Sequence, residues 1–121
     1  MKVFSRDATI ASGQSLSTAI NLGEEYQVGI YQVVGVQMPS AWTTAAISFS
    51  VSADGETFSP LYWNGELYSV AADEGSSAGS AISLEPSAFA AWPYVKILSG
   101  KHGTAVNQAA ARTIKVMLGS M

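Results

Sequence analysis

The chain has 121 residues, no cysteine and a formal net charge of −3, and charged residues make up only 12% of it. This length fits one domain spanning residues 1–121, and the lack of cysteine excludes disulfides and thiolate metal sites. The charged share is about half of the roughly 25% typical of soluble domains. Ala, Ser, Gly and Thr fill the difference, which predicts a weakly charged surface that other protein surfaces can approach closely.

The distribution of charge and hydropathy argues against two classes of partner. Six basic residues are scattered along the chain without forming a stripe, so nucleic-acid binding has little support. No apolar run approaches the ~20 residues of a membrane span. Residues 1–7 lack the hydrophobic block of a secretory signal. We therefore expect a protein that is made and kept in a cytoplasm, or packed into something assembled there.

Residues 26–38 are rich in β-branched and aromatic side chains and poor in helix formers. This composition predicts one or two strands. We expect Val34, Val36 and Met38 to share one face. Gly35 suggests a bulge or a close approach by another backbone.

The centre of the chain reads as an antiparallel meander. Residues 47–52 alternate apolar and polar side chains, which is the period of a strand with one buried and one solvated face. Asn64-Gly65 is a strong hairpin signal, because a type I′ turn needs positive φ at both central residues. Residues 58–63 and 66–70, on either side of the turn, are expected to pair with each other and with residues 47–52.

The last third of the chain contains the only expected helical turn. In residues 85–91, Pro86 suits a first helical position and Phe89 can point into the core. Residues 105–112 have helical composition but are short and uncapped. Strands are expected over residues 94–98 and 113–118, with alternate side chains buried.

Together these segments predict an all-β fold. Many short strands separated by Gly, Ser and Pro turns are typical of a single antiparallel β-sandwich, of jelly-roll type, with at most one or two short helical turns.

The sequence offers little that could carry catalysis. His102 is the only histidine and lies beside Lys101 between two glycines, so we interpret it as a solvated loop residue rather than a base. One histidine without cysteine cannot build the common zinc sites. The adjacent acids at 24–25 and 73–74 look like solvated turns, because neighbours on a strand point to opposite faces. We predict no enzymatic activity, no catalytic residue, no metal site and no cofactor.

The feature that stands out is the aromatic hairpin around Asn64-Gly65. Its two expected faces carry Leu61, Trp63, Tyr68 and Val70 on one side and Phe58, Pro60, Tyr62 and Leu67 on the other. Both faces are mainly apolar or aromatic, and aromatic residues are enriched where proteins touch. The second face is therefore either a contact with another chain or covered by a loop of the same chain. The residues we expect to make subunit or capsid contacts are Tyr26, Tyr31, Tyr62, Trp63 and Tyr68.

Several stretches, in order along the chain, resemble small virion proteins of tailed bacteriophages. They are 8–17 (ATIASGQSLS), 36–43 (VQMPSAWT), 49–58 (FSVSADGETF) with Leu61-Tyr62, 94–100 (YVKILSG) and 107–114 (NQAAARTI). The resemblance implies a virion structural protein, most specifically a capsid decoration or cement protein that stabilises the head noncovalently. It also implies a homotrimer that contacts the major capsid protein or other virion proteins, without nucleic acid or membrane, located in a virion assembled in the host cytoplasm.

Two other functions remain open at this point. One is a tail, baseplate or fibre-associated structural protein of the same fold. The other is a carbohydrate-binding β-sandwich module, because the central and closing motifs also resemble discoidin-like, galactose-binding-type jelly rolls. In those motifs Asp54 can accept hydrogen bonds from backbone amides of its own turn, and Phe58 then returns to the core.

Overall fold

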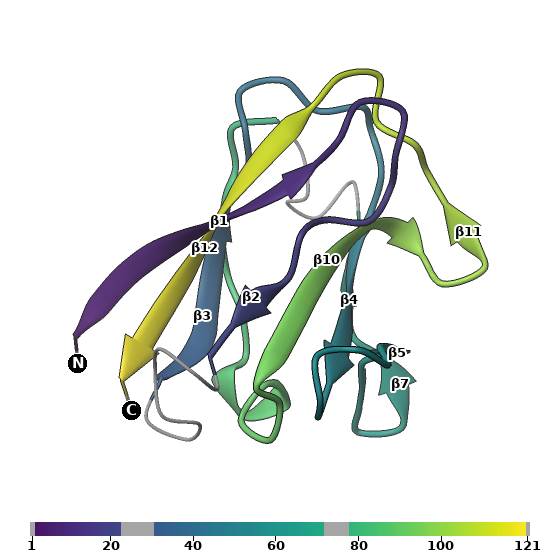
Figure 1. The fold of residues 1–121 in the computed structure, drawn as a ribbon. Coiled ribbons are helices and arrows are strands. Elements are labelled where there is room, and N and C mark those ends of the chain that lie inside the picture. The colour runs from purple at the N-terminus through teal and green to yellow at the C-terminus, as the bar shows by residue number, and fades with distance from the viewer. Residues whose placement is uncertain (1, 23–30, 72–77, 121) are drawn as a thin grey trace.

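The computed structural model describes residues 2–22, 31–71 and 78–120, and within them the chain is all-β (Figure 1). The one helical element described there is a short 3-10 turn. No helix in the described segments is long and apolar enough to cross a membrane. The elements are β1 (Val3–Ile10), β2 (Ile20–Asn21), β3 (Tyr31–Gln37), β4 (Ile47–Ser52), β5 (Ser59–Pro60), β6 (Tyr62–Trp63), β7 (Glu66–Leu67), β8 (Ser69–Val70), β9 (Ala81–Ser83), η2 (Pro86–Ala88), β10 (Tyr94–Lys101), β11 (Thr104–Ala105) and β12 (Arg112–Ser120).

Two antiparallel sheets enclose the core, as the sequence predicted. The first sheet has the order β1-β12-β3-β9. The second has the order β11-β10-β4-β5, and β2 and β8 also pair with β10 and β4. The first sheet lies on one side of the molecule and β10 with β4 on the other (Figure 1). The chain ends meet in the first sheet, where β1 pairs with β12 along its whole length.

The core is built from the inward side chains of both sheets, where alternation of apolar residues is strongest. In β12, Ile114, Val116 and Leu118 are fully buried, and in β10 so are Val95 and Ile97. This confirms the strands expected over residues 113–118 and 94–98. Since one cluster of buried side chains includes residues of both sheets, the two sheets are held together mainly by burial of apolar surface.

Strand β4 corrects the expectation of one buried and one solvated face. Ser48 and Ser52 are each only 2% exposed, although both lie on the polar side of the alternation. The Ser48 hydroxyl donates to the backbone oxygen of Gly100 at 2.8 Å. A serine side chain is small enough for neighbouring backbone to cover it and to accept a hydrogen bond from its hydroxyl. A polar residue can therefore be buried at this position with its hydrogen bond made.

Strand β3 shows the expected irregularity at Gly35, but its faces differ from the expected ones. Met117 pairs with Gly35 while the next residue, Leu118, pairs with Val33, so Val34 is an extra residue in β3. The bulge puts Val33 and Val36 in the core and leaves Val34 half-buried, so Val34 and Val36 do not share a face. A side chain at Gly35 would place Cβ 2.8 Å from the oxygen of Ile82, which confirms the close backbone approach.

The helical turn was predicted correctly, and residues 105–112 form no helix despite their helical composition. Glu85 caps η2 by accepting a hydrogen bond from the amide of Ser87, Pro86 begins it, and Phe89 is 1% exposed. Residues 105–112 contain the end of β11, an irregular connection and the start of β12. The connection is held by Gln108, which is fully buried.

Candidate contact surface

The hairpin at Asn64-Gly65 forms as the sequence predicted. Asn64 has φ 55° and Gly65 has φ 81°, the positive values that a type I′ turn requires. Tyr62 pairs with Leu67 and Trp63 pairs with Glu66. The amide of Tyr68 donates to the oxygen of Leu61 at 2.9 Å, extending the pairing by one step.

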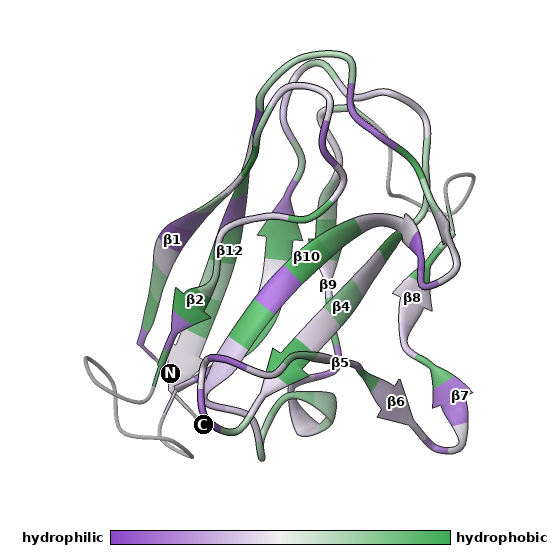
Figure 2. Ribbon diagram, turned by 45° about the vertical axis from the view of Figure 1, so that its right-hand side comes forward, coloured by the Kyte–Doolittle hydropathy of each residue, from purple (hydrophilic) through white to green (hydrophobic). Residues whose placement is uncertain are grey.

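This hairpin is not the middle of a continuous meander. Strands β5 and β8 both pair with β4, while β6 and β7 between them form a separate two-stranded sheet. The hairpin therefore extends away from the second sheet, as Figure 2 shows at its lower right. The expected three-stranded meander is wrong in this respect, because only the two ends of the segment stay on β4.

One face of the hairpin faces its own chain. Leu61 is 2% exposed, and Trp63, Tyr68 and Val70 pack against the core. The side chain of Tyr62, on the other face, is 62% exposed, the largest exposure among the large hydrophobic residues described. The outward-facing aromatic surface of the hairpin is therefore Tyr62.

Tyr68 and Trp63 make their contacts within the chain. The Tyr68 ring lies 5.7 Å from that of Phe49 and 5.5 Å from that of Phe89, and Trp63 lies 6.2 Å from Tyr68. The Tyr68 hydroxyl accepts a hydrogen bond from the amide of Glu85 at 2.8 Å. These two residues connect the hairpin to the core, and their expected role as contacts with other proteins stays a prediction.

The other two aromatic candidates do not belong to the hairpin. Tyr31 begins β3 in the first sheet, where its ring meets that of Phe4 edge to face at 5.0 Å. Tyr26 lies outside the described residues. The expected contact residues that are described thus fall in two places, one on the hairpin and one beside β1.

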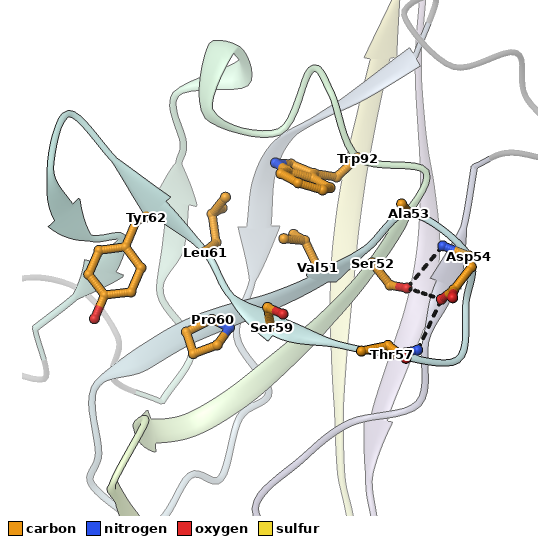
Figure 3. A pocket seen from close by; sticks show the side chains of 10 residues that line it. All are labelled: Val51, Ser52, Ala53, Asp54, Thr57, Ser59, Pro60, Leu61, Tyr62 and Trp92. Carbon is orange, nitrogen blue, oxygen red and sulfur yellow. Dashed lines mark hydrogen bonds between the residues drawn. The ribbon is translucent and has the colours of Figure 1, made fainter.

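A shallow hollow of about 430 Å³ lies next to Tyr62 (Figure 3). Its floor is apolar, and the side chains of Val51, Leu61 and Trp92 converge there. The turn that carries Asp54 forms the opposite rim. Sequence reasoning missed Trp92 and Asp54 as members of a surface with Tyr62, because only the folded chain brings these three segments together.

The Asp54 turn is locked by its own hydrogen bonds. One carboxylate oxygen accepts from the amides of Glu56 and Thr57 at 2.9 and 3.0 Å and from the Ser52 hydroxyl at 2.9 Å. The amides of Thr57 and Glu56, in that order, and then the Ser52 hydroxyl hold the pKa of Asp54 below its usual value. The expected self-bonded turn is confirmed, but Phe58 does not enter the core: it is half-buried under the ammonium of Lys96, 4.4 Å from the ring centre.

Asp54→Asn should change how stability depends on pH. Because the folded state lowers the pKa of Asp54, this carboxylate stabilises the fold above its unfolded value of about 3.8, and that stabilisation is lost as pH falls through the folded pKa. The melting temperature of the wild type should therefore fall more steeply below about pH 4 than that of Asp54→Asn. Melting curves from pH 2 to 7 measure this difference, and parallel curves would contradict it.

The described residues show no constellation typical of catalysis. His102 is exposed in the turn between β10 and β11. No group of three or more His, Asp or Glu side chains within those residues could hold a metal ion. The described surface of Tyr62, Trp92 and the Asp54 turn offers no pair of acid and base.

Comparison with known proteins adds no relative. No family model matches the chain, and neither the curated proteins nor the solved structures searched contain a match.

Proposed function

We propose that this chain is a non-enzymatic structural protein of a tailed-bacteriophage virion, and specifically a capsid decoration protein. The observation that supports this most directly is the exposed Tyr62 on a hairpin that extends from the second sheet, beside an apolar hollow. The low charge of the chain supports it as well, since few charges need to lose water on contact. The resemblance of several sequence stretches to small phage virion proteins is the reason for proposing a phage particle.

The mechanism would be noncovalent clamping. A β-sandwich with a well-packed core is rigid, so it loses little conformational entropy on binding. At about 25 cal/mol per Å², even ~1,000 Å² of net apolar burial against the shell is a large stabilising contribution, and association entropy offsets much of it. Partners would be the major capsid protein, other virion proteins and further copies of this chain.

Heads that carry the protein should withstand higher temperature than heads without it. Particles assembled with and without this chain can be compared by the temperature at which DNA is released. Tyr62→Ala should reduce binding to bare heads about tenfold, the size expected for an exposed aromatic at the centre of a contact. Leu16→Ala, which removes an apolar side chain that is 40% exposed outside the hairpin, is the matched control and should bind normally.

Equal robustness of bare and decorated heads would overturn the decoration role. Gold labelling of intact particles then decides whether the chain lies instead on a tail, baseplate or fibre, the second position that the resemblance allows.

A carbohydrate-binding role has one specific observation in its favour. Tyr62 and Trp92 border the same hollow, which has a hydrogen-bonding rim, and a sugar ring can stack on exposed aromatic side chains of this kind. One Asp54 oxygen on that rim already accepts three hydrogen bonds within the turn, so a sugar hydroxyl would have to use the second carboxylate oxygen. Glycan-array binding that is lost in Tyr62→Ala would support this function, and a flat array would remove it.

A further inference from the structure

The turn of the aromatic hairpin places two groups that can react with each other next to one another in the chain. Asn64 carries a side-chain carboxamide, and Gly65 follows it with a backbone amide that no side chain hinders. When such an amide nitrogen attacks the carboxamide carbon, a five-membered ring closes and ammonia leaves. Both residues are exposed to water at the tip between β6 and β7 (Figure 2).

Neither reacting group is held by a hydrogen bond to any other described residue. The Gly65 amide has no acceptor there, and the Asn64 carboxamide has no partner. A two-residue hairpin pairs the residues on either side of the turn, here Trp63 and Glu66, and leaves the amide of its second central residue unpaired. A Cβ atom built on Gly65 would meet nothing within 4 Å, so the space beside this residue is open.

The other two asparagines of the chain are followed by amides that are already engaged. The amide of Leu22, after Asn21, donates to a backbone oxygen at 2.7 Å. The amide of Gln108, after Asn107, donates to a backbone oxygen at 2.9 Å. At both places the nitrogen has to give up a hydrogen bond before it can attack, and this raises the barrier to ring closure.

The one Asp-Gly sequence of the chain is protected in the same way. The amide of Gly55 donates to the Ser52 hydroxyl at 2.8 Å. One Asp54 oxygen accepts three hydrogen bonds, which hold the carboxylate within its own turn. Only Asn64-Gly65 therefore combines a free carboxamide with a free glycine amide in the part of the chain that the structure describes.

We propose that Asn64 is a site of spontaneous covalent modification, at which the Gly65 nitrogen closes a succinimide ring and water opens it to aspartate or isoaspartate. In the first step a bond forms between the Gly65 nitrogen and Cγ of Asn64. The bond from Cγ to the side-chain nitrogen breaks, and ammonia leaves with the proton of the Gly65 amide. Water then adds to one of the two ring carbonyls: addition at Cγ gives aspartate, and addition at the backbone carbonyl gives isoaspartate.

The hairpin has to open briefly for this reaction, and its architecture makes the opening easy. Ring closure requires the peptide plane between Asn64 and Gly65 to rotate toward the Asn64 side chain. Strands β6 and β7 form a separate two-stranded sheet with only two residue pairs. A two-stranded hairpin is marginally stable by itself, so the tip can open while the two large sheets stay folded.

The two products should affect the hairpin differently. Aspartate keeps the backbone unchanged, and Asp-Gly favours the same type I′ turn as Asn-Gly. Isoaspartate adds one carbon atom to the backbone between Trp63 and Glu66, so these residues can no longer pair across a two-residue turn. The neighbouring pair of Tyr62 and Leu67 should separate with them, which displaces the exposed Tyr62 ring.

This chemistry depends on the turn alone and goes beyond the virion role. It should occur in the purified chain whether or not the chain decorates a phage head. The measurements below therefore succeed or fail independently of that proposed function.

Peptide mapping by mass spectrometry, after incubation in mildly alkaline buffer, measures conversion at each asparagine. Asn-Gly reacts faster than other asparagine sequences even in an unfolded chain, so each rate is divided by the rate of the same site in urea. The folded-to-unfolded ratio at Asn64 should exceed those at Asn21 and Asn107 by about tenfold or more, because their following amides are hydrogen-bonded. An equal or smaller ratio at Asn64 would overturn the proposal.

Two variants separate the effect of isoaspartate from that of charge. Asn64→Gly is the matched control, because Gly-Gly also adopts the type I′ turn but has no carboxamide. NMR cross-peaks between Tyr62 and Leu67 should persist during incubation of this variant, and in wild type they should decline as isoaspartate accumulates. Asn64→Asp, measured before incubation, should keep them. Loss of the cross-peaks in fresh Asn64→Asp, or their persistence in wild type converted to isoaspartate, would contradict the expected effect on the hairpin.

Discussion

Replacing Gln108 with methionine is expected to lower the free energy of unfolding by about 3 kcal/mol. Gln108 is fully buried, and its side-chain amide holds three segments of chain together. The amide nitrogen donates to the oxygen of Thr43 at 3.0 Å and to the hydroxyl of Ser99 at 2.8 Å. The amide oxygen accepts from the amide of Thr43 at 2.8 Å and from Arg112 at 3.1 Å.

A large effect is expected because the substitution leaves several polar groups without hydrogen-bond partners. Methionine has about the volume of glutamine and fills the site. The decrease in the free energy of unfolding therefore reports the lost hydrogen bonds rather than a packing defect. Thr43 would lose partners for both its N–H and its C=O, and the Ser99 hydroxyl would lose the amide donor from which it accepts a hydrogen bond. A buried polar group without a partner costs about 1–3 kcal/mol.

Urea denaturation of the two proteins measures this difference. Gln14→Ala is the control, because the Gln14 side chain is exposed and only its backbone oxygen meets Gln108. That variant should stay within about 0.5 kcal/mol of the wild type. Equal stability of Gln108→Met and the wild type would show that Gln108 is buried without holding the loops.

Gln108 also marks a limit of sequence reasoning. The run Asn107-Gln108-Ala109-Ala110-Ala111 has helical composition, yet the chain passes through it without a helix. The helix propensity of so short a run is small and uncapped. The buried amide network joins Gln108 to Ser99 and to Thr43, which lies 65 positions away in sequence, and outweighs that local preference.

Local signals were reliable where the physics is local. The Asn64-Gly65 turn was predictable because positive φ depends on the two residues themselves. The β12 strand was predictable because alternation of apolar side chains continues along its length. The all-β fold follows from adding such segments together.

Sequence patterns did not predict burial or exposure where a segment distant in sequence determines it. The pattern of β4 could not show that Ser48 would be covered, because the oxygen of Gly100 that accepts its hydroxyl lies 52 positions away in sequence. The hollow beside Tyr62 could not be predicted for the same reason: Trp92 enters it from the connection after η2. Tyr62 is exposed on the second face of the hairpin, where the sequence placed it, and its role as a contact residue stays a prediction.

Phe89→Ala is expected to have the largest effect of any single change considered, about 3–5 kcal/mol of unfolding free energy. The Phe89 ring is 1% exposed and meets Phe49 edge to face at 5.1 Å and Tyr68 at 5.5 Å. Its removal leaves a cavity between η2, β4 and the base of the hairpin. Phe58→Ala is the matched control, because that ring is only half-buried and should cost about 1 kcal/mol or less.

The same variant tests how the contact surface is supported. Tyr68 packs on Phe89 and carries Trp63 of the hairpin, so the cavity should loosen residues 61–68 before the rest of the second sheet. Hydrogen exchange should then speed up at the amide of Tyr68, which bonds to Leu61, more than at the amides of β12. Tyr62→Ala should change neither stability nor exchange, because its exposed ring makes the outer surface without supporting it. Equal acceleration of exchange in both sheets would contradict this expectation. It would mean that the hairpin unfolds together with the whole domain and not as a separate unit held by the contacts of Trp63, Tyr68 and Phe89.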